Sequence, residues 1–204
     1  VTLDAEVYDS KRLTFLGTGN YNAGRVGAQL LAEAIGGAGK VALITKVGQS
    51  NLEERIKGYQ DEFAENFPDV EVVQIIDDQS DSAKAADGLK AVIQRTPDLA
   101  GVGCVEAAGG VGAATASKEL GVTETLKIVS MDRDDGTLKF ISTSLHEIRD
   151  PLTRGAALVL LWESMLEARA TSAAVMEQLL TALPLETNQL TISQMLEYAR
   201  AGFW

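Results

Sequence analysis

Short apolar runs alternate with longer amphipathic stretches over most of the chain. The short runs are rich in β-branched residues and are bounded by Gly, Pro, Asn or Asp, which is typical of buried strands. They predict strands at residues 1–4, 13–17, 40–46, 70–76, 101–105, 126–131 and 140–145. The longer stretches predict helices at residues 21–35, 52–66, 82–95 and 111–120, and later at residues 152–168, 172–183 and from Ser193 onward.

The apolar positions of two of these helices repeat every three or four residues, as the buried face of a helix requires. In residues 21–35 they are Val26, Leu30, Leu31, Ala34 and Ile35, and in residues 82–95 they are Ala85, Leu89, Val92 and Ile93. Pro68 and Pro97 stop the helices before them, because proline cannot continue a helix. Gly121 permits the left-handed residue that often ends a helix.

The regular succession of strand and helix indicates a parallel sheet with helices on both faces. Eight strand–helix units do not fit into 204 residues, which excludes a closed barrel of that kind. We therefore expect an α/β fold with a flavodoxin-like, doubly wound parallel sheet. The pattern does not give the order of the strands.

Charge and cysteine content narrow the class of protein. The formal net charge is −11, which argues against nucleic acid binding, because phosphate contacts need clustered Lys and Arg. The single cysteine, Cys104, excludes an internal disulfide and lies in an apolar run, so we expect it to be buried. The longest apolar stretch, residues 155–165, contains Glu163 and is too short to span a bilayer.

Two segments resemble known motifs but do not match their spacing, and a third is rich in glycine. GTGNYNAG at residues 17–24 is two residues too long for the dinucleotide-binding fingerprint, and we expect Asn20 to cap the following helix. AAGGVGAA at residues 107–114 predicts a second glycine-rich turn that leaves a helix N-terminus open to a polar ligand. In DRDDG, residues 132–136, neither the glycine nor the twelfth position fits a calcium loop.

The sequence gives no indication of catalysis, of a metal site or of a cofactor. The one histidine, His146, has no nucleophile motif around it. Clusters with the spacing of metal ligands are absent from the sequence. We therefore expect a protein that is not an enzyme.

Polar side chains follow several predicted strands at the point where each strand ends. Asp4 ends the first strand, Gln49 and Asn51 follow the third, and Glu106 and Asp132 end the fifth and sixth. Because the carboxyl ends of parallel strands meet at one edge of a sheet, we expect these side chains to face one cleft. An ionised carboxylate accepts two hydroxyl hydrogen bonds with good geometry, which suits a sugar.

Four stretches together resemble one protein family in their order and spacing. They are VTLDAEVYDSKRLTFLGTGNYNAGR, EERIKGYQDEF, RTPDLAGVGCVEAAGGVGAATASKELG and LKIVSMDRDDGTLKFI. Over residues 1–145, and more weakly to the end, the chain is similar to the type 1 periplasmic binding proteins, especially the ribose- and glucose-binding group of ABC sugar transporters. The resemblance implies two α/β lobes that are joined by a hinge and close on a small ligand.

The resemblance also implies how the chain divides. Residues 16–148 would form a nearly complete carboxyl-terminal lobe, residues 1–15 and 149–183 remnants of the amino-terminal lobe, and residues 184–204 a closing segment. Since family members carry most of an amino-terminal lobe before the VTLD strand, we expect the chain to be part of a longer protein. The apolar helix with Leu158, Leu160, Leu161 and Trp162 would then lack cover, which predicts contact with a missing segment or self-association.

The ligand-binding positions of the family carry over one at a time. Asp4 matches a sugar-binding aspartate, and Asp132 matches the aspartate of a strand-end pair. Glu106 falls where many members have Asn, and Glu53 falls where several have a ligand-binding Arg. The neighbouring Arg55 matches an arginine that we interpret as structural.

A last family position, a glutamine near the hinge, maps to either Glu147 or Arg149. The expected pocket is more acidic and less aromatic than a typical sugar site, so a polyol or a cationic ligand is an alternative to a sugar. The resemblance predicts a solute-binding protein, periplasmic or held outside the cell by a lipid anchor, that delivers a sugar-like ligand to the membrane subunits of an ABC importer. Two alternatives stay open: the ligand-sensing domain of a transcriptional repressor or receptor kinase, and a nucleotide-dependent enzyme on a flavodoxin-like sheet.

Overall fold

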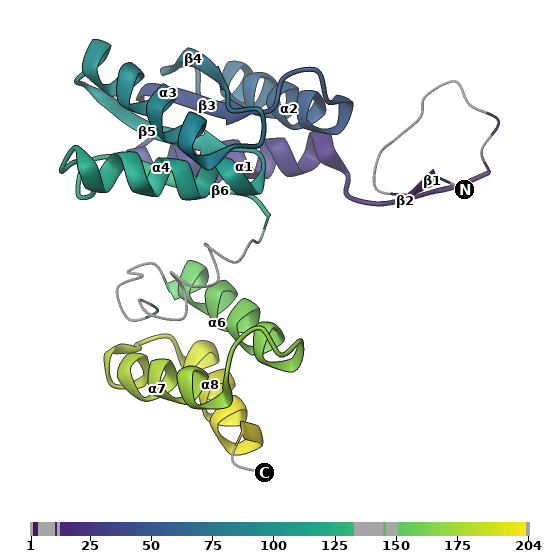
Figure 1. Cartoon of the computed structure of the whole chain (residues 1–204), viewed down its shortest axis with the longest axis vertical. Helices are drawn as coiled ribbons and strands as arrows, with labels where there is room; N and C mark the ends of the chain where they lie inside the picture. The colour runs from purple at the N-terminus through teal and green to yellow at the C-terminus, as the bar shows by residue number, and fades with distance from the viewer. Residues whose placement is uncertain (1, 4–10, 12, 133–144, 146–150, 203–204) are drawn as a thin grey trace. The chain divides into compact units, whose positions relative to one another are not determined.

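The computed structural model describes residues 2–3, 11, 13–132, 145 and 151–202 (Figure 1). The chain divides into two units, Val1–Asp132 and Arg133–Trp204. None of the helices in the described ranges is long and apolar enough to cross a membrane.

A four-stranded sheet is the centre of the first unit. Its strands are β3 (Gly39–Thr45), β4 (Val70–Asp77), β5 (Leu99–Cys104) and β6 (Lys127–Ser130), in the spatial order β4-β3-β5-β6. Every pair in the sheet is parallel, which confirms the prediction of a parallel α/β sheet. Two very short strands, β1 (Thr2–Leu3) and β2 (Phe15–Leu16), pair separately. The strand expected at residues 140–145 lies, apart from Leu145, outside the described residues.

Helices cover both faces of this sheet (Figure 1). They are α1 (Asn20–Ile35) and α2 (Ser50–Asn66) on one face, and α3 (Ser82–Arg95) and α4 (Ala107–Glu119) on the other. Along β3, Val41 and Leu43 belong to the core with α1 and α2, whereas Ala42 and Ile44 belong to the core with α3 and α4. Alternate side chains of a strand point to opposite faces, so this strand contributes to both cores. The sheet is therefore doubly wound, as expected.

The buried face of α1 differs from the predicted one. Val26 and Leu30 are 53% and 44% exposed. Of the predicted positions Leu31 is buried, and the other buried positions include the small residues Gly24, Gly27, Ala28 and Ala32. Small residues are required there because α1 and α2 approach closely: a Cβ on Gly24 would lie 2.0 Å from the carbonyl oxygen of Arg55. The helix packs through its glycines and leaves larger apolar side chains in solvent.

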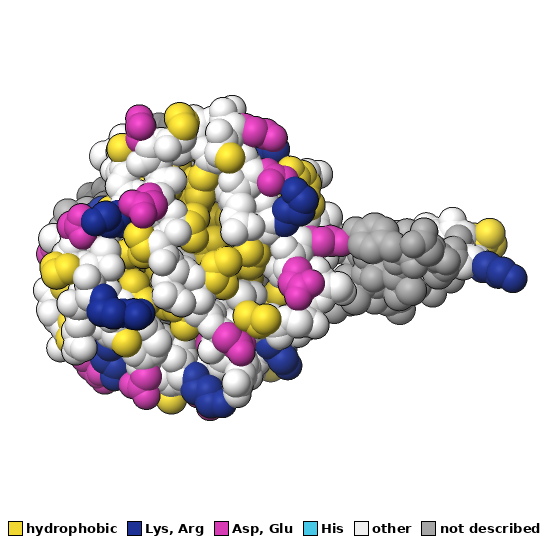
Figure 2. All heavy atoms as spheres, turned by 90° about the horizontal axis from the view of Figure 1, so that it is seen from above, with side chains coloured by type: hydrophobic (Ala, Val, Ile, Leu, Met, Phe, Trp, Pro, Cys, Tyr) yellow, Lys and Arg dark blue, Asp and Glu magenta, His cyan; other side chains and the backbone are white. Residues whose placement is uncertain are grey.

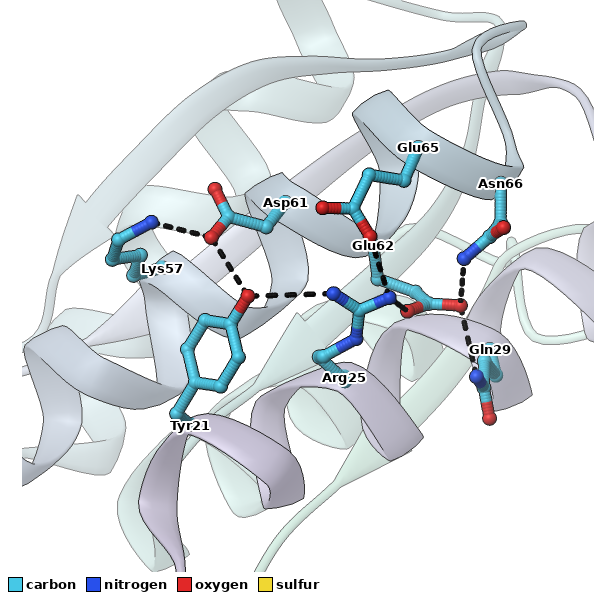
Figure 3. Close-up of polar contacts among 8 residues, drawn as sticks. All are labelled: Tyr21, Arg25, Gln29, Lys57, Asp61, Glu62, Glu65 and Asn66. Carbon is cyan, nitrogen blue, oxygen red and sulfur yellow. Dashed lines mark hydrogen bonds and ion pairs between the residues drawn. The ribbon is translucent and has the colours of Figure 1, made fainter.

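Polar contacts join α1 and α2 beside this close approach (Figure 3). Glu62 is 1% exposed, and its Oε1 accepts hydrogen bonds from Gln29 at 2.8 Å and Asn66 at 2.9 Å. Arg25 lies 2.5 Å from its other carboxylate oxygen. The hydrogen bond from Gln29 is the largest cause of the lowered pKa of Glu62. The network continues through Tyr21, Lys57, Asp61 and Glu65.

Two features near helix starts also differ from the predictions. The glycine-rich segment 107–114 is helical throughout, because it lies inside α4, and it is not a turn. Its glycines serve close packing instead: a Cβ on Gly112 would lie 2.4 Å from the Cβ of Ala85 in α3. At the start of α1 the N-cap residue is Gly19, without a side-chain cap, so the prediction that Asn20 caps this helix is wrong.

β4 lies at an edge of the sheet and carries a row of hydrophobic side chains. Val72, Val73 and Ile75 are half-buried. Figure 2, which views the molecule from above in Figure 1, shows hydrophobic side chains gathered in a band between charged ones. A register shift between β3 and β4 leaves Val73 without an opposite residue, and Glu71 beside it is exposed. Such bulges and charges limit pairing of an edge strand with another chain.

In the described part of the second unit lie the helices α6 (Pro151–Leu166), α7 (Ser172–Ala182) and α8 (Gln189–Gly202), with the short 3-10 helix η2 (Leu183–Leu185) before α8. Leu158 and Leu161 of α6 are 0% and 1% exposed in a core that includes side chains of α7 and α8. Leu160 and Trp162 are half-buried, and Trp162 stacks on Tyr198 with ring centroids 4.4 Å apart. The expectation that this apolar helix lacks cover within the chain is therefore wrong.

The turn before α8 is organised by a buried ion pair. Glu186 lies 2.5 Å and 2.9 Å from two guanidinium nitrogens of Arg154. Asn188 Oδ1 accepts hydrogen bonds from the backbone N–H groups of Leu190 and Thr191. Because Asn188 caps the helix, α8 begins at Gln189, earlier than the predicted Ser193.

We expect Gly24→Ala to destabilise the first unit by about 1–3 kcal/mol, because the new methyl group would overlap the backbone of α2. Urea unfolding followed by circular dichroism measures the loss. Gly19→Ala is the matched control, since a Cβ there meets nothing within 4 Å and its φ of −71° is ordinary for alanine. Equal stabilities of the two variants would contradict the close approach of α1 and α2.

We expect Glu186→Gln to destabilise the second unit by about 3 kcal/mol, because a broken buried ion pair leaves an uncompensated charge. Arg154 holds the pKa of Glu186 down at about 2. A lowered pKa means that the stabilisation is present above the ordinary value of 4.5 and is lost as the pH falls towards 2. Both tryptophans, Trp162 and Trp204, lie in this unit, so tryptophan fluorescence follows its unfolding alone.

The exposed Glu177→Gln on α7 is the control for that substitution and should leave the unfolding curve unchanged. A Glu186→Gln protein that melts like the control, with the same acid transition, would show that the Arg154–Glu186 pair does not stabilise the unit.

Candidate functional site

A polar cavity of about 390 Å³ lies at the carboxyl edge of the sheet in the first unit. Its lining residues are Thr18, Gln49, Asn51, Leu52, Arg55, Ser80, Glu106, Ala107 and Asp132. They come from the segment before α1, the first turns of α2 and the segments that follow β4, β5 and β6. Parallel strands bring these segments together because all four carboxyl ends lie at one edge, where ligands bind in open α/β sheets.

Arg55 is the central cation of this cavity and is only 7% exposed. Its Nε donates to Asn20 Oδ1 at 3.0 Å, and its Nη1 donates to the backbone oxygen of Val105 at 2.7 Å. The same Nη1 lies 3.0 Å from Asp132 Oδ2. One guanidinium thus connects α1, α2, the end of β5 and the residue that follows β6. The interpretation of Arg55 as structural is consistent with these contacts, but the side chain also lines the cavity.

Unusual backbone conformations gather around the cavity. Among the described non-glycine residues, Gln79, Ser80 and Asp132 of the first unit have positive φ values of 53°, 56° and 64°. The left-handed region is unfavourable for such residues and costs about 1–3 kcal/mol where it is imposed. Asp78 Oδ1 supports the turn by accepting from the Ser80 N–H at 3.0 Å. Conformations of this kind persist where the surrounding structure fixes them, which is common at ligand sites.

Two carboxyl groups lie together on one side of the cavity. Glu106 is the N-cap of α4 and accepts a hydrogen bond from the Gly109 N–H at 3.2 Å. Asp78, at the end of β4, is fully buried beside it. Burial first, and then contact with Asp78, raise the pKa of Glu106 to about 7. Cys104, also buried, has a pKa raised by burial, so its thiol is inert at neutral pH.

The structure places four of the eight predicted site residues around the cavity: Gln49, Asn51, Glu106 and Asp132. Glu53 lies in the first turn of α2 but is exposed and does not line the cavity. Asp4, Glu147 and Arg149 lie outside the described residues. Asp132 follows β6 closely, as its strand-end position predicted.

Sequence reasoning missed other residues at this edge. Thr18 and Ser80 line the cavity, and Asp78 lies behind Glu106. The strand-end rule that found Glu106 and Asp132 also applies to the strand at residues 70–76. Its carboxyl end is followed by DDQSD, residues 77–81, so the signal was present. The same rule applied to Thr18, which directly follows the predicted strand at residues 13–17 and lies two residues after the end of β2.

The lining is suited to a small neutral ligand with many hydroxyl groups. Asp132 and Glu106 supply carboxyl oxygens, Gln49 and Asn51 supply amides, and Ser80 supplies a hydroxyl. Asn51 Oδ1 is buried and has no hydrogen-bond partner among the described residues, so it is available to a ligand donor. No group of three His, Cys, Asp or Glu side chains in the described ranges is placed to hold a metal ion.

We expect Arg55→Lys to destabilise the first unit by about 2 kcal/mol or more. A lysine keeps the charge but cannot reproduce the planar fork that reaches Asn20, Val105 and Asp132 together, and hydrogen bonds to charged groups contribute about 1.5–3 kcal/mol. Chemical denaturation measures the change, with the exposed Arg95→Lys as control. If both variants unfold at the same denaturant concentration, the fixed position of the guanidinium is not needed.

Comparison with known proteins identifies the family. The model of the periplasmic binding protein domain matches residues 1–183. Among solved structures, the arabinose-binding protein AraP from Geobacillus stearothermophilus is 33% identical, with a TM-score of 0.64, over 70% of this chain and 49% of its own. A sugar-binding protein of a sugar ABC transporter from Bacillus halodurans is 36% identical, with a TM-score of 0.66, over 69% and 48%.

A solute-binding protein from Burkholderia graminis in complex with D-arabinose is 30% identical, with a TM-score of 0.65, over 70% of this chain and 50% of its own. Comparison with curated protein sequences gives no match. The chain spans about half the length of these solved structures. Because the family model covers most of the chain, the chain belongs to the periplasmic binding protein family.

Proposed function

We propose that the protein captures a small polar ligand, a sugar, in a cleft bordered by the cavity of the first unit, and that it is a binding protein and not an enzyme. The observation that carries this proposal is the polar cavity around the Arg55–Asp132 pair. It lies at the sheet edge where ligands bind in this class of fold. The family supports a sugar, as do the similar structures of an arabinose-binding protein and of solute-binding proteins in complex with D-arabinose and D-allose.

The chemistry of the lining favours hydroxyl recognition. Asp132 is paired with Arg55 through one oxygen and is half-exposed, so its carboxylate remains accessible. Carboxylates and amides accept hydrogen bonds from sugar hydroxyls, while guanidinium and hydroxyl groups donate to sugar oxygens. A charged group that accepts from a hydroxyl typically contributes about 1.5–3 kcal/mol.

The resemblance to the family implies that a second lobe forms the other side of the cleft. We propose that Asp4, together with Glu147 or Arg149, contacts the ligand from the second lobe, and that the lobes close by a hinge rotation. Glu53 is the least supported member of the predicted set, since it is exposed outside the cavity. A cationic ligand is a second proposal, favoured by the number of carboxyl groups: Asp78, Glu106 and Asp132.

We further propose that the protein delivers its ligand to the membrane subunits of an ABC importer from the periplasm, or from the outer face of the cell under a lipid anchor. The similar structures that are binding proteins of ABC transporters support the importer. Self-association was expected from an uncovered apolar helix. Within the described residues α7 and α8 bury Leu158 and Leu161 of that helix, so the proposed function does not depend on a second copy.

A thermal-shift screen of the full-length protein with D-arabinose, D-allose and D-tagatose tests the function, because a ligand that binds only the folded state raises the melting temperature. For a sugar that binds, we expect Asp132→Asn to weaken affinity about ten- to a hundredfold in calorimetry. Asparagine tolerates the positive φ of residue 132 as aspartate does, so we expect the backbone conformation to be retained.

Asp98→Asn is the control for that measurement, since Asp98 pairs with Lys40 at the amino end of β5, the opposite edge of the sheet. Its affinity should equal that of the unchanged protein. A screen in which no sugar raises the melting temperature rejects sugar capture, and equal affinities of the two variants remove Asp132 from the site.

A further inference from the structure

Among the described residues, no lysine or arginine forms an ion pair with either of the two carboxyl groups beside the cavity, Asp78 and Glu106. Asp78 is 0% exposed, and its Oδ2 has no hydrogen-bond partner among the described residues. Glu106 lines the cavity, and one of its oxygens accepts from the N–H of Gly109. An unpartnered buried oxygen costs free energy unless a proton or a ligand satisfies it. The arrangement therefore requires a proton or a donor between the two groups.

The charged groups around the pair do not supply a counter-charge. Arg55 donates to the backbone oxygen of Val105, next to Glu106, but its guanidinium is already paired with Asp132. At the start of α3, Asp81 is exposed and caps its own helix, and Lys84 bonds to Gln79. Cys104 lies against both carboxyl groups from β5 and is neutral. Of the described lysines and arginines, none forms an ion pair with Asp78 or Glu106.

Asp78 is fully buried and Glu106 is half-buried, and two neighbouring carboxyl groups in such a place do not both ionise without cost, because their like charges repel where water is largely excluded. The more buried Asp78 keeps a hydrogen bond from a backbone N–H, as does Glu106. Glu106 is the member that reaches the cavity. A proton held on Glu106 would thus form a hydrogen bond to Asp78 Oδ2 and would lie close to a bound ligand.

We propose that Asp78 and Glu106 share one proton in the free protein and that this proton is linked to ligand binding, so that the single O–H of neutral Glu106 turns from Asp78 to an oxygen of a hydroxylated ligand when the ligand binds. The proposal deepens the proposed function and rests on it. A bound ligand removes water from the cavity, which disfavours the charged form of Glu106, so binding takes up or retains a proton from solvent. The neutral range, in which the pKa of Glu106 lies at about 7, is where the linkage should be visible.

The first experiment needs no ligand. Infrared spectra of the protein between about pH 5 and pH 9 should contain a carboxylic acid C=O band that disappears near neutrality. Glu106→Gln should abolish this band, and Asp78→Asn should move its loss to lower pH, because the neighbouring charge is removed while the hydrogen bond at Ser80 is kept. Glu71→Gln, on the exposed side of β4, is the control and should leave the band unchanged. Absence of a band that titrates near neutrality overturns the shared proton.

The second experiment measures the linkage with the sugar that raises the melting temperature most. If only the protonated form binds, affinity should fall up to about tenfold between pH 6 and pH 8. Calorimetry in buffers of different ionisation enthalpy should show proton uptake on binding. Glu106→Gln should bind with an affinity that does not change with pH, because its amide donates at every pH, and Glu71→Gln should follow the unchanged protein.

The outcomes separate the two proposals. Sugar binding whose affinity is constant with pH, or increases with pH, overturns the linked proton while leaving sugar capture intact. An affinity that increases with pH is the behaviour expected of a cationic ligand that is attracted to two ionised carboxylates. A protein that binds no sugar at any pH overturns the proposed function and the donor role together, and the infrared band alone then decides whether the proton is shared.

Discussion

The buried guanidinium of Arg55 is the contact on which the candidate site depends. A buried charge is tolerated only when it is paired and hydrogen-bonded, and Arg55 meets this condition with three acceptors from three different segments. The same contacts bring the start of α1, the end of β5 and Asp132 together around one cavity. The pairing with Asp132 that makes burial of the Arg55 charge tolerable therefore also positions the carboxylate that faces the ligand.

Arg55 can reach these acceptors because the backbones of α1 and α2 nearly touch at this point. A Cβ on Gly24 would overlap the carbonyl of Arg55, and a Cβ on Gly58 would lie 2.2 Å from the carbonyl oxygen of Tyr21. The ion-pair network centred on Glu62 and Arg25 joins α1 and α2 at a second place further along the helices (Figure 3). Close packing, rather than a large apolar interface, therefore sets the geometry of the cation.

A second part of the cavity lining has a different electrostatic character. There Asp78 and Glu106 form no ion pair with a described lysine or arginine, and burial first, then Asp78, raise the pKa of Glu106 to about 7. One part of the lining thus holds a neutralised ion pair and the other a carboxyl group near its titration point. A site of this kind offers both donors and acceptors to a neutral ligand, and its donor content depends on pH.

Local sequence determined the elements that pack against their neighbours through apolar side chains or end at a glycine. The apolar spacing of residues 82–95 correctly gave the buried side chains Ala85, Leu89 and Val92, because α3 packs through side chains against the sheet. The position of Gly121 correctly indicated a left-handed residue, with φ of +68°. The strand-end rule found Glu106 and Asp132, since parallel topology alone brings carboxyl ends to one edge.

Tertiary structure decided what depends on contacts between distant segments. The buried face of α1 contains the glycines that touch α2. A hydrophobicity pattern instead predicts that Val26 and Leu30 are buried, and both are exposed. The cover of α6 comes from α7 and α8, which its own apolar pattern cannot specify. The Asp78–Glu106 pair joins residues that follow different strands, and only the strand order β4-β3-β5-β6 and the burial of the sheet edge place them together. Sequence thus determined which side chains reach the site, whereas packing decided which of them share a charge, a proton or a backbone contact.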